Sequence, residues 1–294
     1  MHSALTVFHQ DLHQVINPDF EIETLANDCL FTEGPVWNEA GFYLFSDISA
    51  NVVYKLVPGR QKEIYIANSG TDNPGDADLK PGQGGSDGLA YDQEGTLLVC
   101  RHGSHMLAKW DGNQLVPLAT EFKGRPLNSP NDLVVDNQNR IFFSDPPYGL
   151  KEAQPNPAKY QQAARVYCYR NGELKNICER YQYPNGVCIT PNHQHLYICS
   201  TKAFEKFISV YDLATLQFQN VLAEENSDGM KCDQSGNVYL STKDGILILN
   251  SNGQRMGLIA FGSVPANHCF GGVNGKDLFV TARESIFRIK NLLQ

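Results

Sequence analysis

A short segment that recurs along the chain limits the folds that this sequence can adopt. Each copy contains an apolar run, a turn rich in Asp, Asn and Gly, and a second apolar run, as in "NDLVVDNQNRIFFSD" at 131–145. Two apolar runs joined by such a turn are typical of a β-hairpin. The copies begin 42 to 54 residues apart, at Glu33, Asp87, Asn131, Asn185, Asp228 and Phe270. A repeat of about 40 to 50 residues is typical of the four-stranded blades of a β-propeller, so six copies predict six blades.

The rest of the 294 residues fits an all-β chain. β-Branched and aromatic residues fill the apolar runs, and Gly, Asn, Asp and Pro separate them, so little of the sequence favours helix. We therefore predict that residues 1–294 form a single all-β domain, a six-bladed β-propeller. The segment "HQVINPDFEIETLA" at 13–26 is a candidate to pair within the last blade and close the ring.

Charge and hydropathy argue against two classes of partner. The net charge is −8 and no run of Lys or Arg occurs, so the basic surface that neutralises nucleic-acid phosphates is missing. No segment approaches the roughly 18 apolar residues of a membrane span, and the first residues lack the features of a signal peptide. We predict a cytoplasmic monomer or homodimer without nucleic-acid or membrane partners. A periplasmic or secreted location is the alternative if a signal peptide has been removed.

The eight cysteines are predicted to be buried free thiols. Most of them, Cys188 and Cys232 included, stand inside apolar strand-like runs. The chain contains no C-x-x-C pair and no Cys/His cluster with the spacing of zinc ligands. Disulfides and a zinc site of the Cys/His type are therefore not expected.

The first residue of each copy is the main candidate for chemistry. In a propeller built from these hairpins, the first residues all lie on one rim, and inner strands would direct their side chains at the central channel. Carboxylates and amides would then converge without Lys or Arg at the equivalent positions, which is unfavourable unless a cation is bound. Hard oxygen donors suit Ca²⁺, and also Mg²⁺ or Mn²⁺. The alternative is that these residues only form turns, although Glu33 is a poor turn former.

Other residues are expected on the same rim. Arg101 and His102 follow the second strand of their copy, and could bind an anionic or hydroxyl-rich ligand or simply belong to a surface loop. His268 precedes the sixth copy and is a candidate ligand or proton shuttle, while the role of Asp87 stays open. Two polar, proline-bearing insertions, at 68–85 and 146–164, are predicted to lie on this face, and the second is a candidate lid.

Several segments together resemble a known family. They are "EGPVW", "SPND" with "FSDPPYGL", "PNGVCITPN", "SDGMKCDQSGNVYLS" and "CFGG…LFVTA". This combination resembles the senescence marker protein/gluconolactonase/regucalcin family, from about Phe20 to the end of the chain, and it is more similar to the microbial gluconolactonase branch. The resemblance implies a six-bladed propeller that hydrolyses sugar lactones with one divalent cation in the central channel.

The resemblance also implies roles for four of the first residues. Glu33, Asn185 and Asp228 would be metal ligands, and Asn131 would lie beside the metal, completing its coordination or contacting substrate. Asp228 would also be the general base, so that Asp228 and Asn131 are the catalytic candidates. The expected ion is Ca²⁺, with Mg²⁺, Mn²⁺ or Zn²⁺ as alternatives.

Substrate contacts are expected from four residues, namely Asn131, Arg101, His102 and Tyr148. Where animal members of the family carry an arginine two positions before the matching asparagine, this chain has Ser129, so contacts of the regucalcin type are not expected.

The sequence thus predicts a metal-dependent hydrolase that opens sugar lactones. The metal would polarise the lactone carbonyl, and a water molecule would attack it. Two alternatives stay open: a metal-dependent organophosphate or ester hydrolase on the same fold, and a non-enzymatic calcium-binding propeller. The two insertions favour an enzyme, because they would build a pocket over the metal rim.

Overall fold

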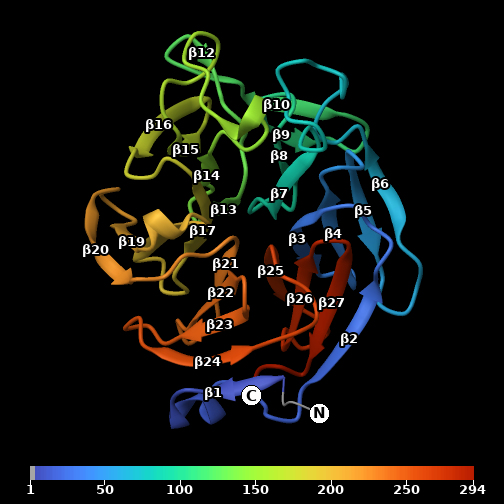
Figure 1. Ribbon diagram of the computed structural model, residues 1–294, viewed down its shortest axis with the longest axis vertical. Helices are drawn as coiled ribbons and strands as arrows, with labels where there is room; N and C mark the ends of the chain where they lie inside the picture. The colour runs from blue at the N-terminus through green and yellow to red at the C-terminus, as the bar shows by residue number, and fades with distance from the viewer. Residues whose placement is uncertain (1–3) are drawn as a thin grey trace.

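Six antiparallel sheets arranged around a central axis make up the protein. The computed structural model describes residues 4–294. Figure 1 looks along this axis and shows the innermost strand of each sheet facing the centre of the ring. The six-bladed all-β propeller predicted from the sequence repeat is confirmed.

Within each blade the strands follow one another outward from the axis. Blade 1 contains β3 (Thr32–Asn38), β4 (Phe42–Asp47), β5 (Val52–Leu56) and β6 (Glu63–Ala67). Blade 2 contains β7 (Ser86–Tyr91), β8 (Leu97–Arg101), β9 (Met106–Trp110) and β10 (Leu115–Ala119). Blade 3 contains β13 (Leu133–Val135), β14 (Ile141–Asp145), β15 (Arg165–Arg170) and β16 (Glu173–Cys178).

The other three blades follow in chain order. Blade 4 contains β17 (Pro184–Ile189), β18 (His195–Ser200), β19 (Ile208–Asp212) and β20 (Phe218–Ala223). Blade 5 contains β21 (Met230–Cys232), β22 (Val238–Thr242), β23 (Gly245–Leu249), β24 (Arg255–Ile259) and β1 (Leu5–Val7). Blade 6 contains β25 (Asn267–Gly271), β26 (Asp277–Ala282), β27 (Ser285–Lys290) and β2 (Glu21–Ala26).

A few short elements lie outside the blades. They are the two-stranded ribbon of β11 (Glu121–Phe122) and β12 (Arg125–Pro126), and the 3-10 turns η1 (Gln10–Gln14), η2 (Lys151–Ala153) and η3 (Ala203–Glu205). No helix in the part of the chain from residue 4 onward is long and apolar enough to cross a membrane.

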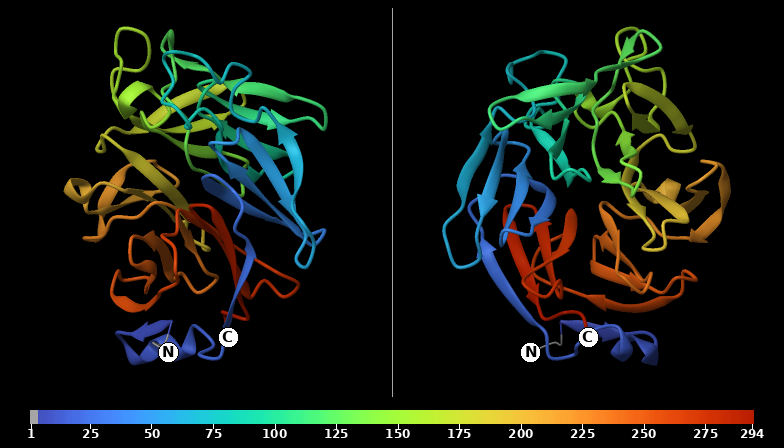
Figure 2. Two further views of the ribbon diagram at one scale, coloured as in Figure 1. Left: turned by 45° about the vertical axis from the view of Figure 1, so that its right-hand side comes forward. Right: turned by 180° about the vertical axis from the view of Figure 1, so that it is seen from behind.

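The start of the chain closes the ring. β2 pairs with β27 in antiparallel register, with Ile22 opposite Ile289, so the outer strand of the last blade comes from the beginning of the sequence. This is the closure predicted for 13–26. β1 adds a fifth strand to blade 5 by pairing with β24. In Figures 1 and 2 the blue segment that contains β1 accordingly lies near the C-terminus.

Apolar side chains fill the spaces between neighbouring blades. Between blades 1 and 6, the ring of Phe279 stacks on Trp37 at 5.1 Å and on Tyr43 at 4.8 Å. Tyr43 and Phe279 are completely buried. Burying one side chain of this size contributes about 1.5–3 kcal/mol, so the blades form a rigid frame for the residues at the axis.

Candidate functional site

The first residues of five sequence copies meet in one pocket at the axis. Glu33 and Asp87 lie at the start of β3 and β7, Asn185 lies at the start of β17, and Asn131 and Asp228 stand just before β13 and β21. The pocket has a volume of about 230 Å³. It is lined by Phe31, Glu33, Ile48, Gln83, Asp87, His102, Asn131, Tyr148, Asn185, Thr201, Asp228 and Arg283.

Glycines that follow the first residues allow this convergence. The amide of Gly186 donates to the carbonyl of Asp228 at 3.1 Å, and the amide of Gly88 donates to the carbonyl of Asn131 at 2.7 Å. A Cβ on either glycine would lie 2.5 Å from that same carbonyl oxygen. Only glycine therefore lets adjacent blades approach closely enough to place their polar side chains side by side.

Hydrogen bonds orient the two asparagines toward the carboxylates. Nδ2 of Asn185 donates to Oδ1 of Asp228 at 2.7 Å, and Nδ2 of Asn131 donates to Oδ2 of Asp87 at 2.6 Å. Since the nitrogen of each amide points at a carboxylate, its oxygen is the atom that each asparagine can offer to a cation. The pocket thus presents amide and carboxylate oxygens together.

The carboxylates of the pocket repel one another. Burial, followed by the charges of Asp87 and Asp228, raises the pKa of Glu33 well above its usual range. Burial and the neighbouring carboxylates do the same to the pKa of Asp87. Burial raises the pKa of Asp228 to about 7, although the positive charge of Arg283 opposes this shift. Three carboxyl groups held this close favour either bound protons or a bound cation.

The residues fit a hard divalent cation. Glu33, Asn131, Asn185 and Asp228 all supply oxygen, which Ca²⁺ and Mg²⁺ prefer. Among residues 4–294, no group of three or more His, Cys, Asp or Glu is arranged as a metal site. The four oxygen donors of the pocket differ from such a group because two of them are asparagines.

His102 pairs with Asp87 at one side of the pocket. Its Nε2 lies 3.0 Å from Oδ2 of Asp87, and its Nδ1 lies 3.2 Å from the carbonyl of Gln83. Burial lowers the pKa of His102 to about 4, so the ring is neutral and carries one N–H. A protonated Asp87, consistent with its raised pKa, would supply the hydrogen for the second contact.

Tyr148 reaches the pocket from the insertion at 146–164. Its hydroxyl forms a hydrogen bond with Oγ1 of Thr201 at 2.7 Å. The two insertions meet over this side of the ring, where the amide of Lys80 donates to the carbonyl of Gly149 at 3.0 Å. As predicted, both lie on the face of the pocket, and each contributes a lining residue, Gln83 and Tyr148.

Two sequence candidates are not brought to the pocket. The Nε of Arg101 donates to the carbonyl of Ser69 at 2.9 Å and its Nη2 to the carbonyl of Asn68 at 3.1 Å, so this guanidinium supports the first insertion. Arg101 is therefore withdrawn from the expected substrate contacts. His268 is completely buried, with Nδ1 2.9 Å from Oγ of Ser241, and does not line the pocket.

Sequence reasoning missed Arg283, whose positively charged side chain lines the pocket and acts on the carboxylate of Asp228. It stands in the turn between β26 and β27, and its guanidinium lies 5.2 Å from the ring centre of Phe31, which also lines the pocket. A signal existed, because Arg283 follows the second strand of the sixth copy, in "LFVTARES". Because the sixth copy begins with Phe270 and not with a polar residue, the sequence does not show clearly that Arg283 lies on the rim.

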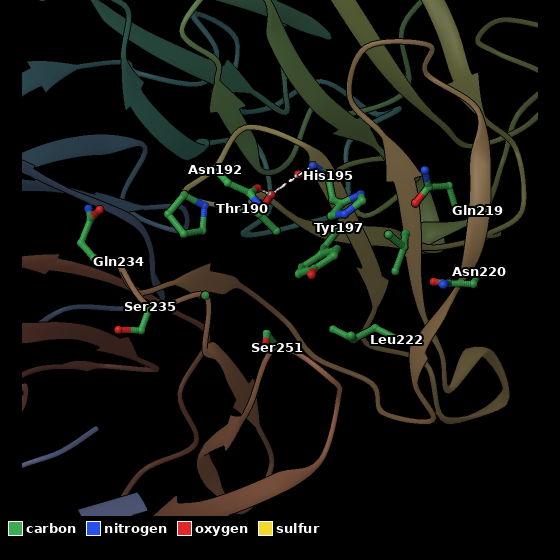
Figure 3. A pocket seen from close by; sticks show the side chains of 13 residues that line it. Thr190, Asn192, His195, Tyr197, Gln219, Asn220, Leu222, Gln234, Ser235 and Ser251 are labelled. Atoms are coloured by element: carbon green, nitrogen blue, oxygen red, sulfur yellow. Dashed lines mark hydrogen bonds between the residues drawn. The ribbon is translucent and has the colours of Figure 1, made fainter. Parts of the chain in front are cut away.

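A larger groove lies at the opposite rim, between blades 4 and 5. It has a volume of about 660 Å³ and is formed largely by the turns after β17 and β21 and by β20 (Figure 3). Its polar side chains are neutral amides and hydroxyls such as Asn192, Gln219 and Ser251, together with His195. Because carboxylates do not converge there, we assign the candidate site to the pocket at the axis.

The raised pKa values predict how the stability of the metal-free protein depends on pH. Between its unfolded value of 3.8 and its folded value of about 7, Asp228 binds more protons in the native state, so native stability is lost as pH rises through 7. Glu33 and Asp87 act in the same direction. We expect urea unfolding in chelator to show a lower free energy of unfolding at pH 8 than at pH 6.5. Asp87→Asn should reduce this difference, and an equal or greater stability at pH 8 would contradict the electrostatic description.

Known proteins are similar to this chain in both sequence and architecture. Residues 31–284 match the model of the SMP-30/Gluconolactonase/LRE-like region. The chain belongs to this family. The family resemblance seen in the sequence is thereby confirmed.

Individual relatives agree with this assignment. Over 97% of this chain and 85% of that protein, the chain is 30% identical to the gluconolactonase of Zymomonas mobilis subsp. mobilis. A gluconolactonase structure from Xanthomonas campestris superposes with a TM-score of 0.83 at 23% identity, covering 99% of this chain and 95% of that one. A calcium-binding regucalcin from Agrobacterium tumefaciens superposes with a TM-score of 0.73 at 16% identity, covering 93% and 95%. The structural matches show the same fold.

Proposed function

We propose that this SMP-30/gluconolactonase family member is a metal-dependent hydrolase that opens sugar lactones. One observation carries the proposal: Glu33, Asn131, Asn185 and Asp228 converge in a single pocket at the axis. The relationship to the gluconolactonase of Zymomonas mobilis over nearly the whole chain supports the choice of lactones.

Glu33, Asn131, Asn185 and Asp228 would hold the cation, and we propose Ca²⁺ because every donor is a hard oxygen. When bound, the cation would polarise the lactone carbonyl and stabilise the charge that develops on its oxygen. Four protein side chains are fewer than the six to eight oxygens that Ca²⁺ takes, so room for water or substrate is expected.

Asp228 is the proposed general base. Because Oδ1 of Asp228 already accepts a hydrogen bond from Asn185, Oδ2 is the oxygen that would receive the proton of the attacking water. The new C–O bond forms first; the ring C–O bond of the lactone then breaks, and the ring oxygen takes the proton back from Asp228 and leaves as the alcohol of the hydroxy acid. The charge of a bound cation would lower the pKa of Asp228 below the value of about 7 that burial produces, keeping the carboxylate ionised at neutral pH.

Side chains around the pocket are suited to binding sugar hydroxyls. Asn131, His102 and Tyr148 present an amide, a neutral imidazole and a phenol to the pocket. The amide and the phenol can exchange hydrogen bonds with hydroxyl groups, while the imidazole, whose two nitrogens already have partners, shapes the wall. Each is held in place by a partner within the protein: Asp87 for the first two and Thr201 for Tyr148. We propose that they orient the lactone ring.

Chelation and metal replacement test this function. Protein treated with chelator should lose hydrolysis of glucono-1,5-lactone, measured as acid release, and one of Ca²⁺, Mg²⁺, Mn²⁺ or Zn²⁺ should restore it. A phosphotriester assayed in parallel separates lactonase from organophosphate hydrolase activity. Cation binding by calorimetry without turnover of either substrate would favour a calcium-binding propeller, and full activity in chelator would contradict the proposed role of the metal.

A further inference from the structure

Two cysteine side chains from neighbouring blades lie in contact outside the candidate site. Sγ of Cys188, on β17, is 3.1 Å from Sγ of Cys232, on β21. This separation is about 1 Å longer than a disulfide bond. Both residues lie on innermost strands, three and four positions after Asn185 and Asp228.

The two thiols differ in their access to solvent. Cys188 is 2% exposed and packs in the apolar cluster between blades 4 and 5. Cys232 is partly exposed at the edge of the same cluster. A dissolved reagent would therefore reach Cys232 first, and Cys188 would be the buried second thiol.

The groove between blades 4 and 5 lies next to this pair. Tyr197 stands opposite Cys188 in the β17–β18 register and also lines the groove, where Figure 3 shows its ring beside His195. The turn that follows Cys232 supplies Gln234 and Ser235 to the same groove. The dithiol is therefore close to a cavity that is large enough to admit a small molecule.

We propose that Cys188 and Cys232 are a redox-active pair that closes to an intramolecular disulfide by exchange with a small-molecule disulfide. The thiolate of Cys232 attacks the reagent, forms a mixed disulfide and releases one small thiol. The thiol of Cys188 then loses its proton and attacks Sγ of Cys232, which releases the second small thiol. The two protein thiols lose two electrons and two protons, and the small disulfide takes them up as two thiols.

The contact between the thiols also predicts the pH dependence of this exchange. The hydrogen bond with Cys188, and then burial, raise the pKa of Cys232 well above its ordinary value. Only a small fraction of Cys232 is thus the reactive thiolate at neutral pH, and that fraction grows about tenfold with each unit of pH below the pKa. The exchange should therefore be slow at pH 7 and faster at pH 8.5.

The bond would join the strands that carry Asn185 and Asp228. Glycine contacts already bring these strands together at the rim, through the hydrogen bond from Gly186 to Asp228. A disulfide between Cys188 and Cys232 would add a covalent link further along the same two strands. This inference does not depend on lactone hydrolysis, and its test does not measure activity.

Intact-mass measurement on the folded, full-length protein is the test. After incubation with oxidised glutathione at pH 8.5, the protein should lose about 2 Da, and a non-reducing peptide map should show the Cys188–Cys232 link. Dithiothreitol should reverse both changes. Unchanged mass at pH 8.5, or a link between other cysteines, would overturn the proposal.

Single variants separate the roles of the two thiols. Cys188→Ser should stop at the mixed disulfide and retain one glutathione on Cys232, because the second thiol is missing. Cys232→Ser should neither lose mass nor bind glutathione at Cys188. Cys168→Ser, a change at another buried cysteine, should behave as the wild type. If Cys188→Ser fails to fold, the peptide map of the wild-type protein still decides between a linked and an unlinked pair.

Discussion

Replacement of Asp228 by asparagine is expected to lower kcat/KM for lactone hydrolysis by at least about 10²-fold, and up to about 10⁴-fold, the range that a general base contributes. The amide keeps an oxygen that can face a cation, but it cannot receive the proton of the attacking water. Asp228→Ala removes both functions and should leave no measurable hydrolysis. Rates should be measured at saturating cation, so that weakened metal binding is not mistaken for lost proton transfer.

An exposed acid on the same blade gives the matched control. Asp244 lies in the turn between β22 and β23, and Asp244→Asn should retain the wild-type kcat/KM. Circular dichroism should be unchanged in all three variants, because Asp228 contributes its side chain to the pocket and not to the apolar packing between blades. If Asp228→Asn keeps most of its activity at saturating cation, Asp228 is not the base.

The sequence was sufficient to predict the repeating part of this protein. Each hairpin copy marks the two inner strands of a blade, and the polar first residue of five copies marks the rim at which their side chains meet. Repetition carries this information, because a feature that recurs in every copy of a hairpin occupies equivalent positions in every blade. The closing strand β2 was also predicted, since the ring needed a partner for its last blade.

Features that occur once were harder to predict. Arg101 and Arg283 both stand at or just after the end of a second strand, yet the first reaches outward to the carbonyls of Asn68 and Ser69, and the second faces the carboxylates. Position in the repeat fixes where a backbone lies, but it does not fix the direction of a long side chain. The contact between Cys188 and Cys232 was likewise hidden, because it depends on how two blades pack against each other.

Glu33→Gln is expected to change both the thermal stability of the metal-free protein and its affinity for a cation. Glu33 is 5% exposed, and burial, followed by the charges of Asp87 and Asp228, raises its pKa. In chelator at pH 8, Glu33→Gln removes a carboxyl group whose ionised form is repelled by its neighbours, while the amide oxygen can still accept the 2.9 Å hydrogen bond from the amide of Gly34. The Tm of the variant should then exceed that of the wild type by about 2–4 °C for each kcal/mol of repulsion relieved.

Saturating cation should reverse this order. A ligand present at 100 times its Kd stabilises the native state by about 2.7 kcal/mol, and the wild type gains this because Glu33 contributes a charged oxygen. Glu33→Gln replaces that ligand with a neutral one, so its affinity for the cation and its gain in Tm should both be smaller. Thermal unfolding of both proteins, with and without Ca²⁺, measures the crossing directly.

A glutamate at the other end of the same hairpin provides the comparison. Glu39 is exposed in the turn between β3 and β4, and Glu39→Gln should follow the wild-type Tm in both conditions. If Glu33→Gln also follows the wild type with and without Ca²⁺, then Glu33 neither repels its neighbours nor binds the cation. If Glu33→Gln is more stable than the wild type in chelator and still gains as much Tm from Ca²⁺, the two effects are separate. Glu33 then repels the neighbouring carboxylates but is not a ligand of the cation.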